Sequence, residues 1–238
     1  MDKKLQFKQI IESSDNIVFF GGAGVSTESN IPDFRSVDGL YSQKYKYPPE
    51  TMLSHTFFAH RTQEFFEFYR DKLLVPWAKP NITHIKLAEL EQKGKLKAIV
   101  TQNIDGLHEM AGSKNIFNLH GTVYRNYCMH CGKFFEMEYI KDSKGVPRCD
   151  KCGGIVKPDV VLYEEGLDDD VVEGAINAIS QADVLIIGGT SLVVYPAAGL
   201  VNYFKGRHLI LINKQITSFD DKADLVFHES LGEMFKLL

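Results

Sequence analysis

Short, almost wholly apolar runs recur along the chain, and each ends at a glycine or a polar residue. They cover residues 17–20, 96–101, 160–163, 184–187 and 209–212. A strand that is apolar along its whole length has no face to turn toward water, so it must be covered on both sides. These runs therefore predict the strands of a parallel sheet that is buried on both faces.

Helical spacing of apolar residues lies between these runs. It covers about residues 82–93, where Gly94 supplies a stop, and it resumes after the acidic residues 168–170, which favour a helix start. Strands that alternate with helices predict an α/β domain with a doubly wound, parallel, Rossmann-like sheet. In this architecture, ligands bind beyond the carboxyl ends of the strands.

Two stretches interrupt the alternation of strands and helices. Residues 57–77 are aromatic and helical in character, and they follow Pro48-Pro49. We expect this segment to cover part of the ligand cleft. Residues 122–157 are poor in aliphatic side chains and contain all the cysteines, so they predict a small inserted module.

Composition narrows the class of protein. The 238 residues include 27 Lys and Arg against 31 Asp and Glu, a net charge of −4, which argues against a generally basic nucleic-acid binder. No apolar stretch approaches the roughly 20 residues that span a bilayer, and the N-terminus lacks the apolar core of a secretion signal. We therefore expect a cytoplasmic protein with no membrane or direct nucleic-acid partner. Its oligomeric state stays open.

Four cysteines form two pairs with metal-binding spacing. Cys128 and Cys131 are followed, after 17 residues, by Cys149 and Cys152. Four thiolates close a tetrahedral zinc site and leave no open position for water, so the predicted zinc is structural. Redox-active pairs or free thiols are the alternatives. A glycine follows each pair and fits the tight turn, and His130 is expected to be a solvated neighbour.

A glycine-rich loop follows the first predicted strand. Gly22-Ala23-Gly24 suggests a cradle for a pyrophosphate. The third glycine of the dinucleotide fingerprint would fall at position 27, where Thr27 stands, and no acidic residue follows at the expected distance. Further polar stretches at 101–108, 119–122 and 188–192 follow predicted strands and suit a ribose and its phosphates.

These polar blocks appear in the order of a known family, and the chain resembles the sirtuins, the NAD-dependent protein-lysine deacylases. We expect a bacterial or archaeal catalytic core. The matching blocks are Gly22-Ala23-Gly24-Val25-Ser26, Ile31-Pro32-Asp33-Phe34-Arg35, the stretch 101–108, His120-Gly121-Thr122, the cysteine pairs, the stretch 157–161, the stretch 189–197, and Ile212-Asn213-Lys214.

The resemblance implies a role for each matching residue. His120 is the general base, Asn103 holds the nicotinamide ribose or a water beside it, and Asp105 binds the carboxamide. An extended acyl-lysine peptide would add as a strand at Val160, Val161, Leu162, Tyr163 and Val193. The implied NAD site contains Gly22, Ala23, Gly24, Thr27, Asp33, Phe34, Arg35, Gln102, Asn103, Ile104, Asp105, His120, Gly189, Thr190, Ser191, Asn213 and Lys214.

The resemblance also implies the reaction. The acyl oxygen attacks the anomeric carbon of the nicotinamide ribose, nicotinamide leaves, and His120 takes a proton from a ribose hydroxyl. The products are free lysine, nicotinamide and an O-acyl-ADP-ribose. NAD is thus a consumed co-substrate, and the chain is an acyl transferase with one structural zinc.

The implied division of the sirtuin catalytic core, residues 1–238, has two parts. The large, NAD-binding part covers about 1–40, 80–121 and 158–238. The small part combines a helical cofactor-loop segment, about 41–79, with the zinc module, about 122–157.

Other functions remain open from the residues alone. A mono-ADP-ribosyltransferase shares the glycosidic cleavage, and a pyridine-nucleotide oxidoreductase shares the glycine loop. A zinc-ribbon binding module without catalysis would explain the cysteines, although not Asn103, Asp105 and His120 together.

Three positions depart from the family pattern. Gly21 stands where threonine is frequent, and we expect little effect. Asn30 replaces a glycine and is the next best residue for a left-handed backbone, so the turn should be kept. Glu164 replaces a glycine beside the predicted peptide strand, where it bears on the local turn and on peptide preference.

The acyl pocket is expected in the aromatic helical segment. Sirtuins that prefer negatively charged acyl groups carry Phe-Tyr-x-x-Arg there, and alignment on the first aromatic puts Phe66 and Tyr69 at the Tyr and Arg positions. Both side chains are neutral, so we predict a preference for small neutral acyl groups. A shifted register would offer Lys72, which lacks the two-pronged geometry of arginine. The alternative is that these aromatics belong to the core.

Overall fold

The computed structural model describes residues 2–33 and 46–238. Within them the largest element is a six-stranded sheet in the order β3-β2-β1-β7-β8-β9, and every neighbouring pair is parallel. This order places β1 in the middle, with the chain winding outward on both sides, which confirms the predicted doubly wound sheet. The strands are β1 (Ile17–Gly21), β2 (Leu96–Thr101), β3 (Ile116–Asn118), β7 (Val184–Gly188), β8 (His208–Ile212) and β9 (Leu225–Phe227).

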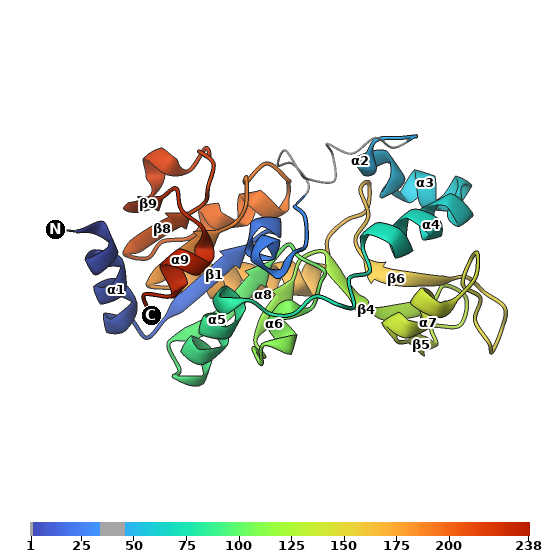
Figure 1. The fold of residues 1–238 in the computed structure, drawn as a ribbon, viewed down its shortest axis with the longest axis horizontal. Helices are drawn as coiled ribbons and strands as arrows, with labels where there is room; N and C mark the ends of the chain where they lie inside the picture. Colours follow the sequence, from blue (N-terminus) through green and yellow to red (C-terminus); the bar gives the residue numbers. More distant parts are fainter. Residues whose placement is uncertain (1, 34–45) are drawn as a thin grey trace.

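Helices cover both faces of this sheet (Figure 1). Ile17 and Phe19 of β1 pack into one core cluster with the helices of the first face, while Val18 and Phe20 pack into a second cluster. Because both faces of the sheet are apolar, each needs a covering layer of helices. The first layer is α1 (Lys3–Ser13), α5 (Ile82–Gln92) and α9 (Leu231–Phe235); the second is α8 (Asp169–Gln181) and the 3₁₀ helix η4 (Ala197–Tyr203).

A second body lies beside the large sheet, at the right of Figure 1. It contains an antiparallel sheet in the order β5-β4-β6 and the helices that pack on it. The elements are α2 (Pro49–Met52), α3 (His55–His60), α4 (Thr62–Lys72), β4 (Gly121–Cys128), β5 (Phe134–Phe135), α7 (Met137–Asp142) and β6 (Val156–Val160). Arg70 of the α4 helix joins α4 to α7, because its guanidinium donates to the Ile140 carbonyl at 2.9 Å and to Ser143 Oγ at 2.8 Å.

Two predicted elements differ from the structure. The strand expected at 160–163 lies earlier, because β6 pairs with β4 through Val156 and Lys157 and ends at Val160. The helical segment expected at 57–77 ends at Lys72. Pro76 disfavours helical backbone at the residue before it, so a helix cannot run on to 77 there.

The predicted helix start at Asp168, the stop at Gly94 and the turn at Asn30 agree with the structure. Asp168 caps α8 by accepting from the Val171 amide at 3.0 Å, and Gly94 follows α5 in left-handed backbone with φ of 72°. Asn30 adopts φ of 61°, so the turn is kept as expected. No helix within residues 2–33 and 46–238 is long and apolar enough to cross a membrane.

Two buried histidines face each other. His84 of α5 and His108 of α6 (Leu107–Met110) have ring centroids 4.7 Å apart and are almost fully buried. His84 Nδ1 accepts from the Asn81 amide at 3.2 Å, whereas both ring nitrogens of His108 have no hydrogen-bond partner within the described residues. Burial lowers the pKa of His84 to about 4 and lowers that of His108 well below its usual value.

We expect this pair to make the fold sensitive to acid. Between pH about 6.5 and about 4 the unfolded chain binds more protons at His84 than the folded chain does, so the free energy of unfolding falls as pH falls. The contribution of His84 is about 3 kcal/mol. Urea unfolding across this pH range measures it, and His84→Gln, which keeps an acceptor for the Asn81 amide, should flatten the slope. An unchanged slope in that variant would contradict the assignment.

Candidate active site

The carboxyl ends of four parallel strands lie in one row. Gly21 of β1 pairs in register with Thr101 of β2 and with Gly188 of β7, and Gly188 pairs with Ile212 of β8. The residues that follow these four positions therefore emerge at one edge of the sheet. This is the edge at which doubly wound folds bind their ligands. The sequence predicted site residues at 22–27, 102–105, 189–191 and 213–214, and all these segments begin here.

The glycine loop after β1 packs directly on the loop after β7. The Gly24 amide donates to the Gly189 carbonyl at 2.8 Å, and a Cβ on Gly24 would lie 2.7 Å from the Gly189 Cα. Gly22 is equally restricted, because its Cβ would lie 2.8 Å from Thr190 Cβ. Glycine is thus required for the close approach of two backbones. Instead of entering a helix at once, the loop makes the 3₁₀ turns η1 (Ala23–Val25) and η2 (Thr27–Ser29), as expected for a long ordered loop.

A second contact joins the loops after β2 and β7. Gln102 Nε2 donates to Thr190 Oγ1 at 3.1 Å, and the same oxygen accepts from the Leu192 amide at 3.2 Å. Thr27 Oγ1 donates to the Gly24 carbonyl at 3.0 Å and so fixes the glycine loop internally. The structure therefore brings Gly22, Gly24, Gln102, Gly189 and Thr190 into one connected set.

Asn213 follows β8 in the same row. Its backbone amide donates to the Phe227 carbonyl at 3.0 Å, and its side-chain Nδ2 donates to the Gln215 carbonyl at 2.8 Å. Lys214 is exposed, and Ser191 and Ala23 are half-buried.

A buried hydroxyl links the two polar residues after β2. Ser26 Oγ donates to Asp105 Oδ2 at 2.6 Å and accepts from Asn103 Nδ2 at 3.2 Å. Asp105 Oδ1 also accepts from the Leu107 amide at 3.0 Å. Burial raises the pKa of the Asp105 carboxyl, and the Ser26 and Leu107 donors oppose that rise. Asn103 and Asp105 are thereby held in fixed positions at the sheet edge.

Ser26 was not among the predicted site residues, although it lies in the first matching block. Its side chain is 1% exposed and its hydroxyl has both a donor and an acceptor partner. A small polar residue two places after a glycine turn gives no separate signal of its role. Only the fold, which brings position 26 against positions 103 and 105, shows the contact.

His120 lies between β3 and β4, at the junction of the two bodies. Its Nδ1 lies 2.8 Å from the Gln102 carbonyl oxygen, which can only accept, so Nδ1 carries the proton and Nε2 is left with a lone pair. Burial lowers the pKa of His120, and the Gln102 carbonyl partly opposes this. The imidazole is therefore neutral near pH 7 and able to accept a proton.

Of four further predicted cofactor contacts, two lie outside the described residues. Phe34 and Arg35 belong to the undescribed range 34–45. Asp33, at the end of the described segment, is half-buried. Ile104 is partly buried against the core of the small body, and its carbonyl accepts from the Val123 amide of β4 at 3.0 Å.

The predicted acyl-pocket residues lie inside an aromatic cluster on α4. Phe66 and Tyr69 are both 0% exposed, and they pack with Phe58 and Phe65. Burial raises the pKa of Tyr69, whose hydroxyl has no hydrogen-bond partner within the described residues.

The predicted peptide strand is mostly bonded within the chain. Glu165 accepts from the Leu162 amide through its carboxylate at 2.9 Å and donates to the Leu162 carbonyl through its own amide at 3.0 Å. Tyr163 pairs with the chain around Ser54, since its amide donates to the Leu53 carbonyl and its carbonyl accepts from the His55 amide. Among the described residues, the Val161 carbonyl and the amide and carbonyl of both Glu164 and Val193 have no hydrogen-bond partner.

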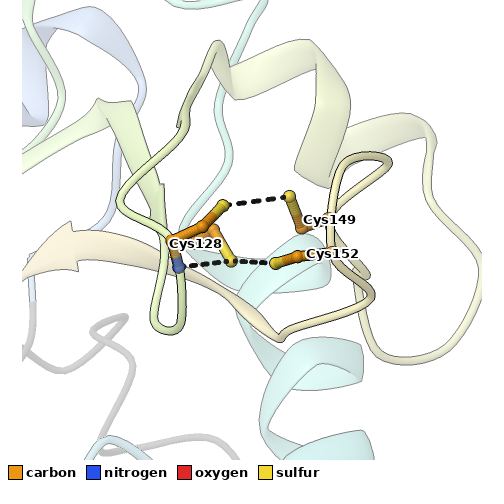
Figure 2. Close-up of side chains that lie close together, drawn as sticks. Cys128, Cys149 and Cys152 are labelled. Carbon is orange, nitrogen blue, oxygen red and sulfur yellow. Dashed lines mark hydrogen bonds between the residues drawn. The ribbon is translucent and has the colours of Figure 1, made fainter.

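The four cysteines converge at the end of the small sheet (Figure 2). Their sulfur atoms all lie within 4.8 Å of one another, with Cys128–Cys152 at 3.4 Å and Cys131–Cys149 at 3.7 Å. Four sulfurs around a tetrahedral zinc at 2.3 Å would stand about 3.8 Å apart, so this set fits that ion.

Matched turns build the two halves of the cysteine site. The Gly132 amide donates to the Cys128 carbonyl at 2.9 Å, and the Gly153 amide donates to the Cys149 carbonyl at 2.8 Å. Both glycines are left-handed, with φ of 69° and 74°, as predicted from their places after each pair. His130 is exposed and is not part of the sulfur cluster.

Fold and site together define an α/β enzyme with polar loops gathered at the carboxyl edge of its sheet, a buried histidine beside them and a module with four clustered cysteines. Comparison with known proteins makes the class specific. The profile of the Sir2 family matches residues 22–196. The chain belongs to the Sir2 family.

Similar proteins cover the chain almost completely. It is 64% identical to an "NAD-dependent protein deacetylase" of Clostridium acetobutylicum, over 99% of this chain and 98% of the relative. It is 45% identical to a protein of the same description from Staphylococcus aureus, over 97% of this chain and 96% of the relative.

Solved structures give the same relationship. A Sir2 structure with deacetylated p53 peptide and 3'-O-acetyl ADP-ribose has a TM-score of 0.90 at 38% identity and covers 98% of this chain and 96% of its own. A Sir2 structure with p53 peptide and NAD⁺ has a TM-score of 0.85 at 40% identity, over 97% and 95% of the two chains.

Proposed function

We propose that this protein is an NAD-dependent protein-lysine deacetylase. It transfers the acyl group of an acyl-lysine peptide to ADP-ribose, with release of nicotinamide and O-acyl-ADP-ribose. The observation that carries the proposal is the position of a neutral, oriented His120 beside the fixed pair Asn103 and Asp105, at the carboxyl edge of a doubly wound sheet. Relatives at 64% identity carry the same activity in their names.

His120 acts as the general base. Its Nδ1–H bond to the Gln102 carbonyl orients the ring and leaves Nε2 to take a proton from a ribose hydroxyl. The lowered pKa keeps Nε2 unprotonated at neutral pH, so the base is ready before substrate binds. NAD supplies the sugar carbon to which the acyl oxygen becomes attached, and it is consumed.

Asp105 and Asn103 position the nicotinamide side of NAD. Each oxygen of the Asp105 carboxylate accepts one bond inside the chain and has a lone pair left for a carboxamide N–H. Asn103 is fixed through Ser26 and holds the ribose or a water beside it. Gln102 and Thr190 line the cleft from the facing loops. The proposed set also includes Ala23, Thr27, Asp33, Phe34, Arg35, Ile104, Ser191, Asn213 and Lys214.

The acyl-lysine peptide adds as a strand to the open backbone around Val161, Glu164 and Val193. Unpaired amides and carbonyls of an extended segment are the usual anchor for such a peptide. Leu162 and Tyr163 hold this edge in place through their bonds to Glu165 and to the chain around Ser54. Acetylated-peptide complexes of similar Sir2 structures support this class of substrate.

The cysteine module holds a structural zinc through Cys128, Cys131, Cys149 and Cys152. A closed set of four thiolates stabilises the small sheet and offers no position for a reacting water. Reduced thiols that bind metal also support a cytoplasmic location. The shared core of α3, α4 and the zinc module supports the division into a large NAD-binding part and a small part at the limits given above.

Incubation of the purified protein with NAD and an acetyl-lysine peptide tests the proposal. Mass spectrometry should show the free lysine peptide, nicotinamide and O-acetyl-ADP-ribose in equal amounts. Formation of NADH would instead identify an oxidoreductase, and ADP-ribose attached to protein would identify an ADP-ribosyltransferase. Either result without deacetylation would overturn the proposal.

The acyl preference follows from the neutral residues on α4. We expect kcat/KM for an acetyl peptide to exceed that for the matching succinyl peptide by tenfold or more, on the order of one missing charge pair in a buried site. No arginine stands at 66 or 69, and both side chains are buried among aromatic rings. Parallel kinetics on the two peptides measure the ratio. Faster succinyl removal would contradict it.

A further inference from the structure

A hollow of about 410 Å³ begins at the open edge of the proposed peptide strand. Tyr163 and Glu164 line it from the strand side, and residues of α2 and α3 line it from the other. Phe57 and the partly exposed ring of Tyr163 give it apolar surface. A substrate side chain beside the acetyl-lysine would therefore find a ready cavity of mixed character.

Glu164 adds a fixed carboxylate to the lining of this hollow. Its Oε2 accepts from the Thr56 amide at 2.9 Å and from Thr56 Oγ1 at 2.7 Å. Its Oε1 accepts no hydrogen bond from any described residue. Glu164 also adopts left-handed backbone with φ of 76°, a conformation that is easy only for glycine and here is held by the two Thr56 bonds. The pKa of Glu164 is lowered by these bonds, so the side chain is ionised.

The charges that line the hollow do not cancel. Glu50 is a second carboxylate, and it makes no ion pair with any described residue. The guanidinium of Arg61 also lines the hollow, but it is bonded to Glu64 Oε1 at 2.7 Å, and Lys46 lies 3.7 Å from the same carboxylate. Glu50 and Glu164 therefore give the hollow an excess of negative charge beside an apolar wall. That combination suits an aliphatic stem with a cationic head.

We propose that Glu164 is a specificity-determining residue, and that the hollow between the 163–164 turn, α2 and α3 receives a lysine or arginine that flanks the acetyl-lysine of the substrate. The inference rests on the proposed deacetylase function and names a substrate class for it: acetylated segments with a nearby basic residue. The free Oε1 of Glu164 supplies the acceptor, and the open amide and carbonyl of Glu164 hold the substrate backbone next to it.

Peptide kinetics test this assignment. One acetyl peptide is made with Arg, Ala or Glu, in turn, at each of the three positions on either side of the acetyl-lysine. At one or more positions we expect kcat/KM to favour Arg over Ala by about fivefold, the size of a partly exposed ion pair, and to disfavour Glu. The advantage should fall as salt rises.

Substitutions of Glu164 test whether its negative charge causes the preference for Arg peptides. Glu164→Gln keeps an oxygen for Thr56 and removes the charge, so the ratio of Arg to Ala peptides should fall toward one. Glu164→Lys should invert the preference toward the Glu peptide. Glu173→Gln, an exposed carboxylate on α8, is the control and should keep both activity and ratio.

The outcomes separate this inference from the function beneath it. Deacetylation of all the peptides at equal rates, or an unchanged ratio in folded Glu164→Gln, would overturn the basic subsite and leave the deacetylase intact. Failure to deacetylate any peptide would overturn the proposed function, and the subsite with it.

Discussion

A chain with His120→Ala is expected to lose deacetylation by about a hundredfold or more, the usual contribution of a positioned general base. His120 Nε2 is the only ring atom of this residue with a free lone pair, because Nδ1 donates to the Gln102 carbonyl. Alanine removes the base and its bond to the Gln102 carbonyl, while the Gln102 Nε2–Thr190 Oγ1 bond between the two loops does not involve His120. Rates of O-acetyl-ADP-ribose formation measure the loss, and NAD binding by calorimetry should change far less.

The control is His208→Ala, at the start of β8 in a half-buried position away from the cleft. It should keep near-normal activity. The pH profile gives a second test, because the lowered pKa of His120 places the acid limb of the wild-type rate below the usual histidine value of about 6.5. Near-normal deacetylation by folded His120→Ala would remove His120 from the mechanism.

The middle of the large sheet could be predicted because β1 and β7 are buried on both faces. Val18 and Phe20 face one helical layer while Ile17 and Phe19 face the other, so every position must be apolar and the run is visible in the sequence. The strand β6 is buried on one face only. It alternates buried and half-buried residues from Val156 to Val160 because only one side meets a core, and its proline and charged residues conceal it.

The site could be predicted only where a residue has a motif of its own. Asn103, Asp105 and His120 stand in recognisable blocks after strands, and the structure connects Asn103 to Asp105 through Ser26. The role of Ser26 depends on a contact across 79 positions of sequence, which spacing cannot show. The role of Glu164 could not be predicted for the same reason. The bonds that fix its carboxylate come from Thr56, which is 108 positions away in the sequence.

Zinc removal is expected to have the largest effect on the fold. Binding to four thiolates in isolated zinc modules contributes about 10–16 kcal/mol of folding free energy. The strand β4 begins directly after His120 and ends at Cys128. Its Val123 amide donates to the carbonyl of Ile104, the neighbour of Asp105. Loss of the metal should therefore unfold the small sheet and also displace the base and the nicotinamide side of the cleft.

Cys149→Ser tests this prediction with the whole chain. Metal analysis should fall from about one zinc per chain to a small fraction, the melting temperature should drop, and deacetylation should fall by tenfold or more. His130→Ala is the matched control, because His130 lies between the first cysteine pair yet is exposed and outside the sulfur cluster. It should keep its zinc and its activity. A Cys149→Ser chain that stays folded and fully active without metal would show that the small body is stabilised by its apolar core alone, and that β4 does not transmit the metal site to His120.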